Sequence, residues 1–308
     1  MSATAAKHAG LLGIEHLDRT EIQEILERAR FFQPLPNETY KRLDTLKGKT
    51  VVNLFFEAST RTRVSFEIAA RRLGADTLTI AAQGSSVSKG ESLVDTLNTL
   101  AAMRPHAIVM RHAASGAPQF LARHLQIPIV NAGDGTHEHP TQALLDARTI
   151  LDHRPSLTGL RVAIIGDIAH SRVARSNVHL LSKFGADIVL CGPPSLLPQE
   201  LKDLAPGVSL AWNMTEAIQG ADVIMMLRVQ LERQNEAPMS AGEYFRFYGL
   251  RLEHLEHAKP GVIVMHPGPI NRGRELSSEV ADSQSSVILN QVENGVAVRM
   301  AVLERILS

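Results

Sequence analysis

VVNLFFEASTRTRVSFEIAARRLG, residues 51–74, is the stretch that decides the fold. An unbroken apolar run from Val51 to Phe56 is typical of a strand that is buried on both faces. Ser59 is then a candidate helix N-cap, and Gly74 suits the C-cap of the same helix. Between these two caps, apolar residues recur at the spacing of one helix face: Phe66, Ala69, Ala70 and Leu73. The stretch therefore predicts a buried strand, a turn and an amphipathic helix.

Five polar residues, Ser59-Thr60-Arg61-Thr62-Arg63, fall at the turn between this strand and this helix. Free backbone N–H groups point out of a helix N-terminus, and the helix dipole there favours negative charge. The hydroxyls and guanidiniums add further hydrogen-bond donors to the same end. The turn therefore predicts a site for a phosphate-sized anion. The alternative is an ordinary capped helix whose arginines are solvated.

Composition narrows the class of protein. The chain has 308 residues, which favours two domains, and its 32 Lys and Arg balance its 32 Asp and Glu, so net charge does not favour nucleic-acid binding. Cys191 is the only cysteine, which excludes an intrachain disulfide framework and fits a reducing compartment. No apolar run reaches the roughly 18 residues of a membrane helix. We expect a cytoplasmic protein whose first 13 residues form a loose tail and not a signal peptide.

Strand patterns alternate with helix patterns along the first half of the chain. Asp18 and Glu21 resemble a helix capping pair, and Pro140 suits the first position of a later helix. Apolar runs that predict strands lie at residues 51–56, 77–80, 106–110 and 127–130. Such alternation predicts a mainly parallel, doubly wound sheet, in which ligands bind at the carboxyl ends of the strands.

A second alternating series follows a linker at His153–Ser156. Its strand patterns lie at residues 161–165, 188–191, 208–212, 223–227 and 262–265, and the chain ends in an apolar helical pattern over 287–307. The sequence therefore predicts an α/β protein with two doubly wound parallel-sheet lobes and a cleft between them. We expect residues 1–152 in the first domain, together with a C-terminal helix over 287–308, and residues 153–286 in the second.

Polar residues follow the predicted strands of the first lobe. Arg111 comes directly after a strand, where it would meet a ligand or form a surface ion pair. His137, His139 and Gln142 lie in GTHEHPTQ. The H-x-H pattern suggests a metal, but no cysteine or H-E-x-x-H pattern supplies further zinc ligands. An imidazole and an amide before a helix can instead donate hydrogen bonds to a carbonyl oxygen. Spacing alone favours a third interpretation, a capping and packing role.

The second lobe has comparable residues after its strands. Arg172 ends the segment GDIAHSR at a predicted helix start, and Arg228 follows the strand VIMML. Two arginines at two strand ends fit a dianionic substrate, although either one alone is more often a solvated charge. His266-Pro267-Gly268-Pro269 predicts a rigid turn with free carbonyl groups. A dinucleotide site is disfavoured because G-x-G-x-x-G is absent after the strand LRVAIIG.

Seven segments together resemble, in order, those of the aspartate transcarbamoylase catalytic chains, within the aspartate/ornithine carbamoyltransferase superfamily. They are FFEASTRTR, KGES, VMRH, DGTHEHPTQ, GDIAHSR, RVQLER and MHPGPINRG, and they span most of the chain. The resemblance implies transfer of the carbamoyl group of carbamoyl phosphate to the α-amine of L-aspartate. The products would be N-carbamoyl-L-aspartate and phosphate, in pyrimidine biosynthesis. It also implies that the C-terminal helix packs back on the first lobe.

The resemblance assigns roles residue by residue. Contacts to carbamoyl phosphate would come from Ser59, Thr60, Arg61, Thr62, Arg111, His139, Gln142, Gly268 and Pro269. Catalysis would fall to four of these: Arg61, Thr62, Arg111 and His139. Contacts to aspartate would come from Lys89, Arg172, Arg228 and Gln230, with Ser85 near Lys89 in a loop that reaches a neighbouring subunit. No metal and no cofactor are implied. The implied partners are the two substrates, a homotrimer with shared sites, and a possible regulatory or dihydroorotase-like chain, but no nucleic acid or membrane.

Three alternatives stay open at this point. Ornithine transcarbamoylases have an H-C-L-P motif and an S-M-G segment where this chain has His266–Pro269 and Arg228-Val229-Gln230, and two arginines would repel a cationic amino acid. A nicotinamide-dependent dehydrogenase would use VAIIGD, against which the missing glycines argue. A non-catalytic member of the fold would lack the anion turn or the HPTQ segment, and both are present.

Overall fold

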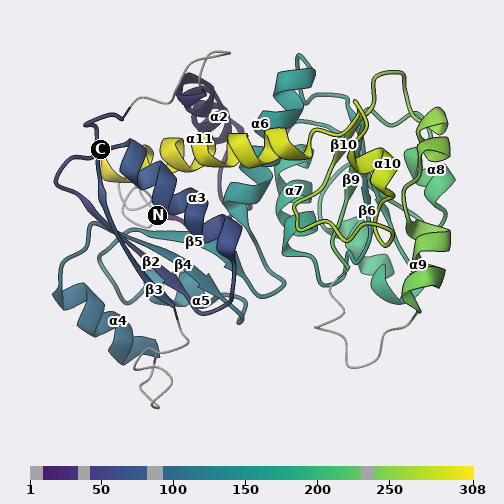
Figure 1. Cartoon of the computed structure of the whole chain (residues 1–308). Coiled ribbons are helices and arrows are strands. Elements are labelled where there is room, and N and C mark those ends of the chain that lie inside the picture. Colours follow the sequence, from purple (N-terminus) through teal and green to yellow (C-terminus); the bar gives the residue numbers. More distant parts are fainter. Residues whose placement is uncertain (1–9, 34–41, 82–92, 230–238) are drawn as a thin grey trace. The chain divides into compact units, whose positions relative to one another are not determined.

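A computed structural model describes residues 10–33, 42–81, 93–229 and 239–308 of the chain (Figure 1). Its internal contacts divide the chain into two compact units. The first unit comprises Met1–Leu144 and Glu293–Ser308, and the second comprises Leu145–Val292. Each unit is built on a five-stranded sheet in which all the paired strands are parallel, as the alternating pattern predicted. No helix in the described ranges is long and apolar enough to cross a membrane.

The sheet of the first unit has the strand order β1-β5-β4-β2-β3. Its strands are β1 (Gly10–Leu11), β2 (Thr50–Phe55), β3 (Asp76–Ala81), β4 (Ala107–His112) and β5 (Ile129–Asp134). Strand β3 lies on one side of β2, whereas β4 and then β5 lie on its other side, so the chain changes direction across the sheet between β2 and β4. In an open parallel sheet, ligands bind at the carboxyl ends of the strands beside such a change.

Helices cover both faces of this sheet (Figure 1). Those that lie wholly in the first unit are α2 (Arg19–Phe32), α3 (Thr60–Arg72), α4 (Leu93–Ala102) and α5 (Ala117–Ala122). Leu54, Met110 and Ile129 pack with Leu100 of α4 and Leu121 of α5 in one apolar cluster. Helix α3 lies on the opposite side of the sheet in Figure 1. Its predicted apolar stripe is fully buried: Phe66, Ala69, Ala70 and, directly after the helix, Leu73.

The caps of α2 and α3 follow from the local sequence. Asp18 and Glu21 form the predicted capping box of α2, and Ser59 is the N-cap of α3. The C-cap of α3 is Leu73, and not Gly74 as the sequence predicted. Gly74 is the next residue, with φ of +87°, which is the left-handed position that glycine commonly takes just after a helix.

The last helix is α11 (Ile288–Leu307), and its residues from Glu293 onward belong to the first unit. The Arg28 guanidinium donates to Glu304, and its Nη2 lies 2.6 Å from Oε1 of that residue. Arg305 pairs with Glu21 in α2, and the Arg299 guanidinium lies 5.0 Å from the centre of the Phe66 ring in α3. These contacts confirm that the C-terminal helix packs back on the first lobe.

The expectation of a loose N-terminal tail is wrong from Gly10 onward. Gly10 pairs with Ile129 and Leu11 with Val130, so β1 extends the sheet beyond β5. The side-chain Nδ2 of Asn131 then donates to the carbonyl of Leu12 at 2.9 Å. A strand of two residues is too short to show an alternating pattern, which is why the sequence did not reveal it.

The second unit has the strand order β10-β9-β6-β7-β8. Its strands are β6 (Arg161–Ile165), β7 (Asp187–Cys191), β8 (Val208–Ala211), β9 (Val223–Met226) and β10 (Ile263–Met265). Its helices are α6 (Pro140–His153), which begins in the first unit, α7 (Arg172–Lys183), α8 (Met214–Ile218), α9 (Ala241–Tyr248) and α10 (Ser278–Ala281). Short 3₁₀ helices lie at Pro194–Leu196, Gln199–Asp203 and Leu252–His257.

One apolar cluster of the second unit lies between its sheet and the helices α8, α9 and α10. Ile165, Cys191 and Met226 project from the strands into a cluster with Met214 of α8 and Tyr244 of α9. Burial raises the pKa of the Cys191 thiol to about 12, so this cysteine behaves as a core residue and not as a nucleophile. In Figure 1, α7 lies on the other side of the same sheet.

We predict that Gly74→Ala lowers the thermal unfolding midpoint by at least about 2 °C. Alanine would have to adopt a positive φ there, and its Cβ would lie 2.6 Å from the backbone oxygen of Leu43. Gly220→Ala is the matched control, since Gly220 also has a positive φ but has open space where a Cβ would be. Scanning calorimetry of both variants makes the comparison. Equal losses would show that crowding against Leu43 has no effect.

Candidate active site

The predicted anion turn lies where β2 meets α3. Ser59 is the N-cap, but within the described residues its hydroxyl makes no capping hydrogen bond to the helix. Thr60 and Arg61 are exposed in the first turn of the helix, and Thr62 is buried. The first turn contains no acidic residue. The N-terminus of α3 thus keeps donors and positive charge facing outward, which suits an anion.

Arg111 lies inside β4, one strand over from the anion turn, and not just after the strand as the sequence predicted. It stands opposite Phe55 in the sheet register. Its Nη2 donates to Oε1 of Glu57 at 2.8 Å, and its Nη1 lies 3.3 Å from the carbonyl oxygen of Ala132. Glu57, which follows β2, was not singled out in the sequence. The pair fixes the guanidinium at the carboxyl end of the sheet between β2 and β5.

The third strand end, after β5, carries the GTHEHPTQ segment. Strand β5 runs to Asp134, four residues beyond the predicted end, and it stays paired with β4 there, with Asn131 opposite Met110 and Asp134 opposite His112. The polar side chains of Asn131 and Asp134 are buried and bonded to each other at 2.8 Å. His139 is buried, and its carbonyl accepts from the backbone N–H groups of Gln142 and Ala143 at the start of α6. Pro140 is the first residue of that helix, as predicted.

A buried carboxylate, Asp134, organises this segment. Its oxygens accept hydrogen bonds from the backbone N–H groups of Gly116 at 2.6 Å and Glu138 at 3.1 Å, and Nδ1 of His137 lies 3.0 Å away. Burial by itself would raise the pKa of Asp134, but the hydrogen bonds from His137, Asn131 and Gly116 lower it below its ordinary value. The hydrogen bond to Asp134 raises the pKa of His137.

The strand order brings these three groups to one place. Strands β5, β4 and β2 are neighbours, and their carboxyl ends share one edge of a parallel sheet. That edge carries the anion turn, Arg111 and the segment with His139 and Gln142. The structure therefore unites, within the first unit, seven of the nine residues predicted to contact carbamoyl phosphate.

The second unit repeats the arrangement with β10, β9 and β6 as neighbours. Arg172 is the first residue of α7 after β6 and is buried, and the Ser171 hydroxyl caps that helix at Ala174. Arg228 follows β9, and Gly268 and Pro269 follow β10. The remaining predicted residues, Lys89 and Gln230, lie outside the described residues, as does Ser85.

A buried glutamate that the sequence analysis did not single out, Glu275, supports two of these strand ends. Its carboxylate accepts from the backbone N–H of Val229, next to Arg228, at 3.1 Å. It also accepts from the backbone and side-chain nitrogens of Asn271, both at 2.8 Å. The turn before Asn271 is held at its other end, since the N–H of Gly268 donates to Nδ1 of His266 at 2.8 Å. One carboxylate thus ties the segment of Arg228 to the turn of Gly268.

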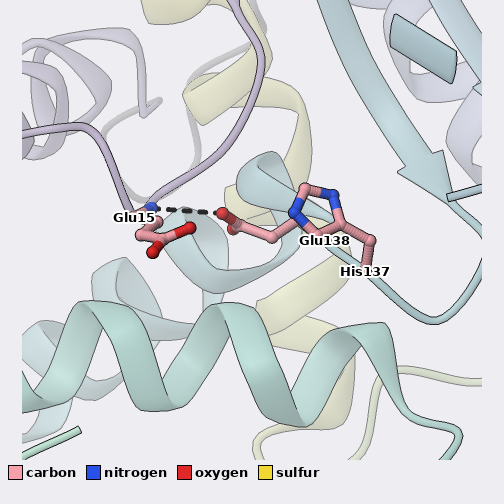
Figure 2. Close-up of side chains that lie close together, drawn as sticks. All are labelled: Glu15, His137 and Glu138. Atoms are coloured by element: carbon pink, nitrogen blue, oxygen red, sulfur yellow. Dashed lines mark hydrogen bonds between the residues drawn. The ribbon is translucent and has the colours of Figure 1, made fainter. Parts of the chain in front are cut away.

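The two histidines of the H-x-H motif differ in exposure, since His139 is buried and His137 is partly exposed. His137 approaches Glu15 and Glu138, with one ligand-type atom from each of the three within 4.8 Å of the others (Figure 2). Glu15 is exposed and Glu138 is buried. Neither glutamate was singled out in the sequence, because a glutamate beside a histidine carries no signal of a partner over 120 residues away.

Family models match both parts of the chain. Residues 9–152 match the carbamoyl-phosphate-binding domain of the aspartate/ornithine carbamoyltransferases, and residues 158–306 match the Asp/Orn-binding domain. The chain is 77% identical over 299 residues to the aspartate carbamoyltransferase catalytic subunit of Solibacter usitatus, covering 97% of this chain and 99% of that one. It is 55% identical to the subunit of the same name from Geobacter sulfurreducens, covering 96% of each.

Solved structures with both specificities resemble the chain. An aspartate transcarbamoylase of Trypanosoma cruzi in complex with N-(phosphonacetyl)-L-aspartic acid has a TM-score of 0.88 at 32% identity, covering 100% of this chain and 98% of that one. An ornithine carbamoyltransferase of Pyrococcus furiosus has a TM-score of 0.85 at 31% identity, covering 96% of each. The backbone fold is therefore shared by enzymes that act on amino acids of opposite charge.

We predict that His137→Gln destabilises the protein most at mildly acidic pH. Because the pKa of His137 is raised on folding, its stabilising effect is complete below its unfolded pKa of about 6.5 and is lost as pH rises through the folded value. Because the pKa of Asp134 is lowered, its contribution is lost as pH falls through that lowered value, starting from about 3.9. The pair thus stabilises fully between about pH 4 and 6.5.

Thermal midpoints of wild type and variant across pH 4–9 measure this difference. His257→Gln is the control, since His257 is exposed in the second unit. A midpoint difference that stayed constant with pH would contradict a charged His137–Asp134 pair.

Proposed function

The chain belongs to the aspartate/ornithine carbamoyltransferase family, and we propose from this that it transfers the carbamoyl group of carbamoyl phosphate to the α-amine of L-aspartate. The products are N-carbamoyl-L-aspartate and phosphate. The observation that carries the proposal is the meeting of the anion turn, Arg111 and the His139 segment at the adjoining ends of β2, β4 and β5. One edge of one sheet thereby offers donors for a phosphate and for a carbonyl oxygen.

Carbamoyl phosphate is assigned to the first unit. Its phosphate would accept hydrogen bonds from Ser59, Thr60, Arg61 and Thr62 at the N-terminus of α3. Arg111, His139 and Gln142 would hold its carbonyl oxygen and amide. The backbone of Gly268 and Pro269 would add contacts to the carbamoyl group. In this assignment the Glu57–Arg111 pair holds the guanidinium in place before the substrate binds, which lowers the conformational entropy lost on binding.

The chemistry needs positioning and charge stabilisation. The deprotonated amine of aspartate attacks the carbonyl carbon and forms a tetrahedral oxyanion. The bond from carbon to the bridging oxygen then breaks, phosphate leaves with that electron pair, and the amine loses its proton to the departing phosphate. Arg111, His139 and the Thr62 hydroxyl would donate to the oxyanion, and Arg61 would stabilise the leaving phosphate. The activated acyl phosphate makes no demand for a metal or an organic cofactor.

Aspartate is assigned to the second unit. Arg172 and Arg228 would each grip one carboxylate, with Gln230 and Lys89 adding contacts. The distinction from ornithine rests on charge, because two guanidiniums attract a dicarboxylate and repel a cationic side chain. The 77% identical relative from Solibacter usitatus carries the aspartate name, which supports the same choice.

The setting of the enzyme is part of the proposal. We assign the reaction to pyrimidine biosynthesis in the cytoplasm. A homotrimer with sites shared between subunits would bring Lys89, with Ser85 nearby, into a neighbour's site. A regulatory or dihydroorotase-like chain is a possible partner in a larger assembly.

The function is tested by incubating the purified protein with carbamoyl phosphate and either L-aspartate or L-ornithine. We expect carbamoyl-aspartate with equimolar phosphate and no citrulline, because the second unit offers arginines to carboxylates. Chromatographic separation of the products decides between them. Citrulline as the main product would reassign the substrate, and phosphate release without either product would overturn carbamoyl transfer.

We predict that Arg61→Ala loses at least about a hundredfold in turnover, the scale of one lost transition-state donor. Arg71→Ala is the matched control, since Arg71 is exposed at the other end of α3 and should keep normal turnover. Calorimetry with a bisubstrate mimic that carries a phosphonate and two carboxylates extends the test. Arg61→Ala and Arg228→Ala should each weaken that binding. Near-normal turnover in Arg61→Ala would remove this residue from the mechanism.

A further inference from the structure

Glu138 is a buried carboxylate beside His139 that the proposed mechanism does not use. It is 1% exposed, so its charge needs compensation from within the protein. Its carboxylate accepts from the backbone N–H of Ile14 at 2.9 Å and 2.8 Å, one bond to each oxygen. It also accepts from the backbone N–H of Glu15 at 3.1 Å, the dashed line in Figure 2. Backbone donors more than 120 residues away in sequence thus hold this side chain.

The approach of the two segments is close. A Cβ on Gly13 would lie 2.4 Å from Oε1 of Glu138, a distance that real Cβ contacts do not reach. Glycine at this position therefore leaves room for the carboxylate. Because the carboxylate is held by two backbone N–H groups, of which that of Ile14 is shared between both oxygens, it has little freedom to move aside for a larger residue.

The backbone of Glu138 is fixed as firmly as its side chain. Its N–H donates to Oδ1 of Asp134, and its carbonyl accepts from the N–H of Asp134 at 3.1 Å. Asp134 itself is anchored on Asn131, whose Nδ2 also donates to the carbonyl of Leu12. The segment before His139 is thus bonded to β5 on one side and to Ile14 and Glu15 on the other.

We propose that Glu138 is a positioning residue, which holds the segment of His139 against residues 12–15 and so fixes where the imidazole of His139 meets the substrate. We name these hydrogen bonds between Glu138 and residues 14–15 the N-terminal clasp. The inference rests on the proposed function, in which His139 donates to the carbonyl oxygen of carbamoyl phosphate. The clasp acts through the main chain, because His139 follows Glu138 directly and begins the turn into α6.

A cation bound by Glu15, His137 and Glu138 is the competing interpretation of the same cluster. Both oxygens of Glu138 already accept backbone hydrogen bonds, and Nδ1 of His137 is bonded to Asp134. The His137 imidazole, whose hydrogen bond to Asp134 raises its pKa, adds positive charge among these carboxylates when protonated. The clasp needs only the main chain of Glu15, whereas a cation would need its carboxylate. A change to the Glu15 side chain therefore distinguishes the clasp from a cation site.

Glu138→Gln tests the clasp, because the amide would turn an N–H₂ group toward backbone N–H donors. We expect turnover to fall by about tenfold to a hundredfold, the range for a small misplacement of a catalytic group, with the KM for aspartate changed less than about twofold. Glu15→Gln should keep wild-type turnover. Circular dichroism at the assay temperature checks that both variants are folded. Wild-type turnover in Glu138→Gln would overturn the proposal.

A double-mutant cycle asks whether Glu138 acts through His139. If it does, Glu138→Gln should cause no further loss of turnover in the His139→Ala background, measured at high enzyme concentration. Losses that multiply would assign Glu138 a separate role and overturn the proposal. Gly13→Ala disturbs the clasp from the other side and leaves all predicted site residues intact. It should reproduce the fall in turnover, and unchanged turnover would count against the clasp.

Calorimetry of the wild type with Mg²⁺ or Zn²⁺ alone, repeated on Glu15→Gln, tests whether this cluster binds a cation. Binding that disappears with Glu15→Gln, joined to a loss of turnover in that variant, would replace the clasp by a metal site. A wild type that forms no carbamoyl-aspartate would overturn the proposed function itself, whereas an active wild type with an equally active Glu138→Gln overturns the clasp alone.

Discussion

The parallel pairing of strands is the constraint on which the structure depends. It places all carboxyl ends of a sheet at one edge, so residues distant in sequence meet there without any contact of their own to bring them together. In the first unit this edge collects a helix N-terminus, a guanidinium and an imidazole-bearing segment from β2, β4 and β5. In the second it collects two arginines and a turn from β6, β9 and β10. At the same edge the strands end, so the backbone N–H and C=O groups there need hydrogen-bond partners other than a neighbouring strand.

Buried carboxylates supply those partners. Asp134 and Glu138 bind backbone N–H groups around the His139 segment, and Glu275 does so around Arg228 and the turn of Gly268. Glu57 instead holds the Arg111 side chain. A carboxylate with several backbone donors satisfies its own charge and fixes the donors in space. In the proposed mechanism, the loops that carry reacting groups would gain rigidity in this way.

Substrate choice is separated from the fold in this family. The backbone resembles an aspartate transcarbamoylase and an ornithine carbamoyltransferase with TM-scores of 0.88 and 0.85. A shared fold therefore supports transfer of a carbamoyl group but does not name the acceptor. We propose that the acceptor is set by a few charges after strands of the second unit. Arg172 and Arg228 would match a dicarboxylate in sign and in their capacity for bidentate hydrogen bonds.

The sequence by itself determined the alternating elements, the N-terminal capping box of α2, the buried stripe of α3 and the motif at its N-terminus, because helix and strand periods and capping chemistry are local. It did not reveal β1, the extension of β5 to Asp134, or the partners of Glu57, Glu138 and Glu275. Those depend on segments that are far apart in the chain, and a buried polar residue looks like a surface one until its donors are known. Only the tertiary structure decided that Ile14 and Glu15 meet Glu138, because their backbone N–H groups lie more than 120 residues away from it along the chain.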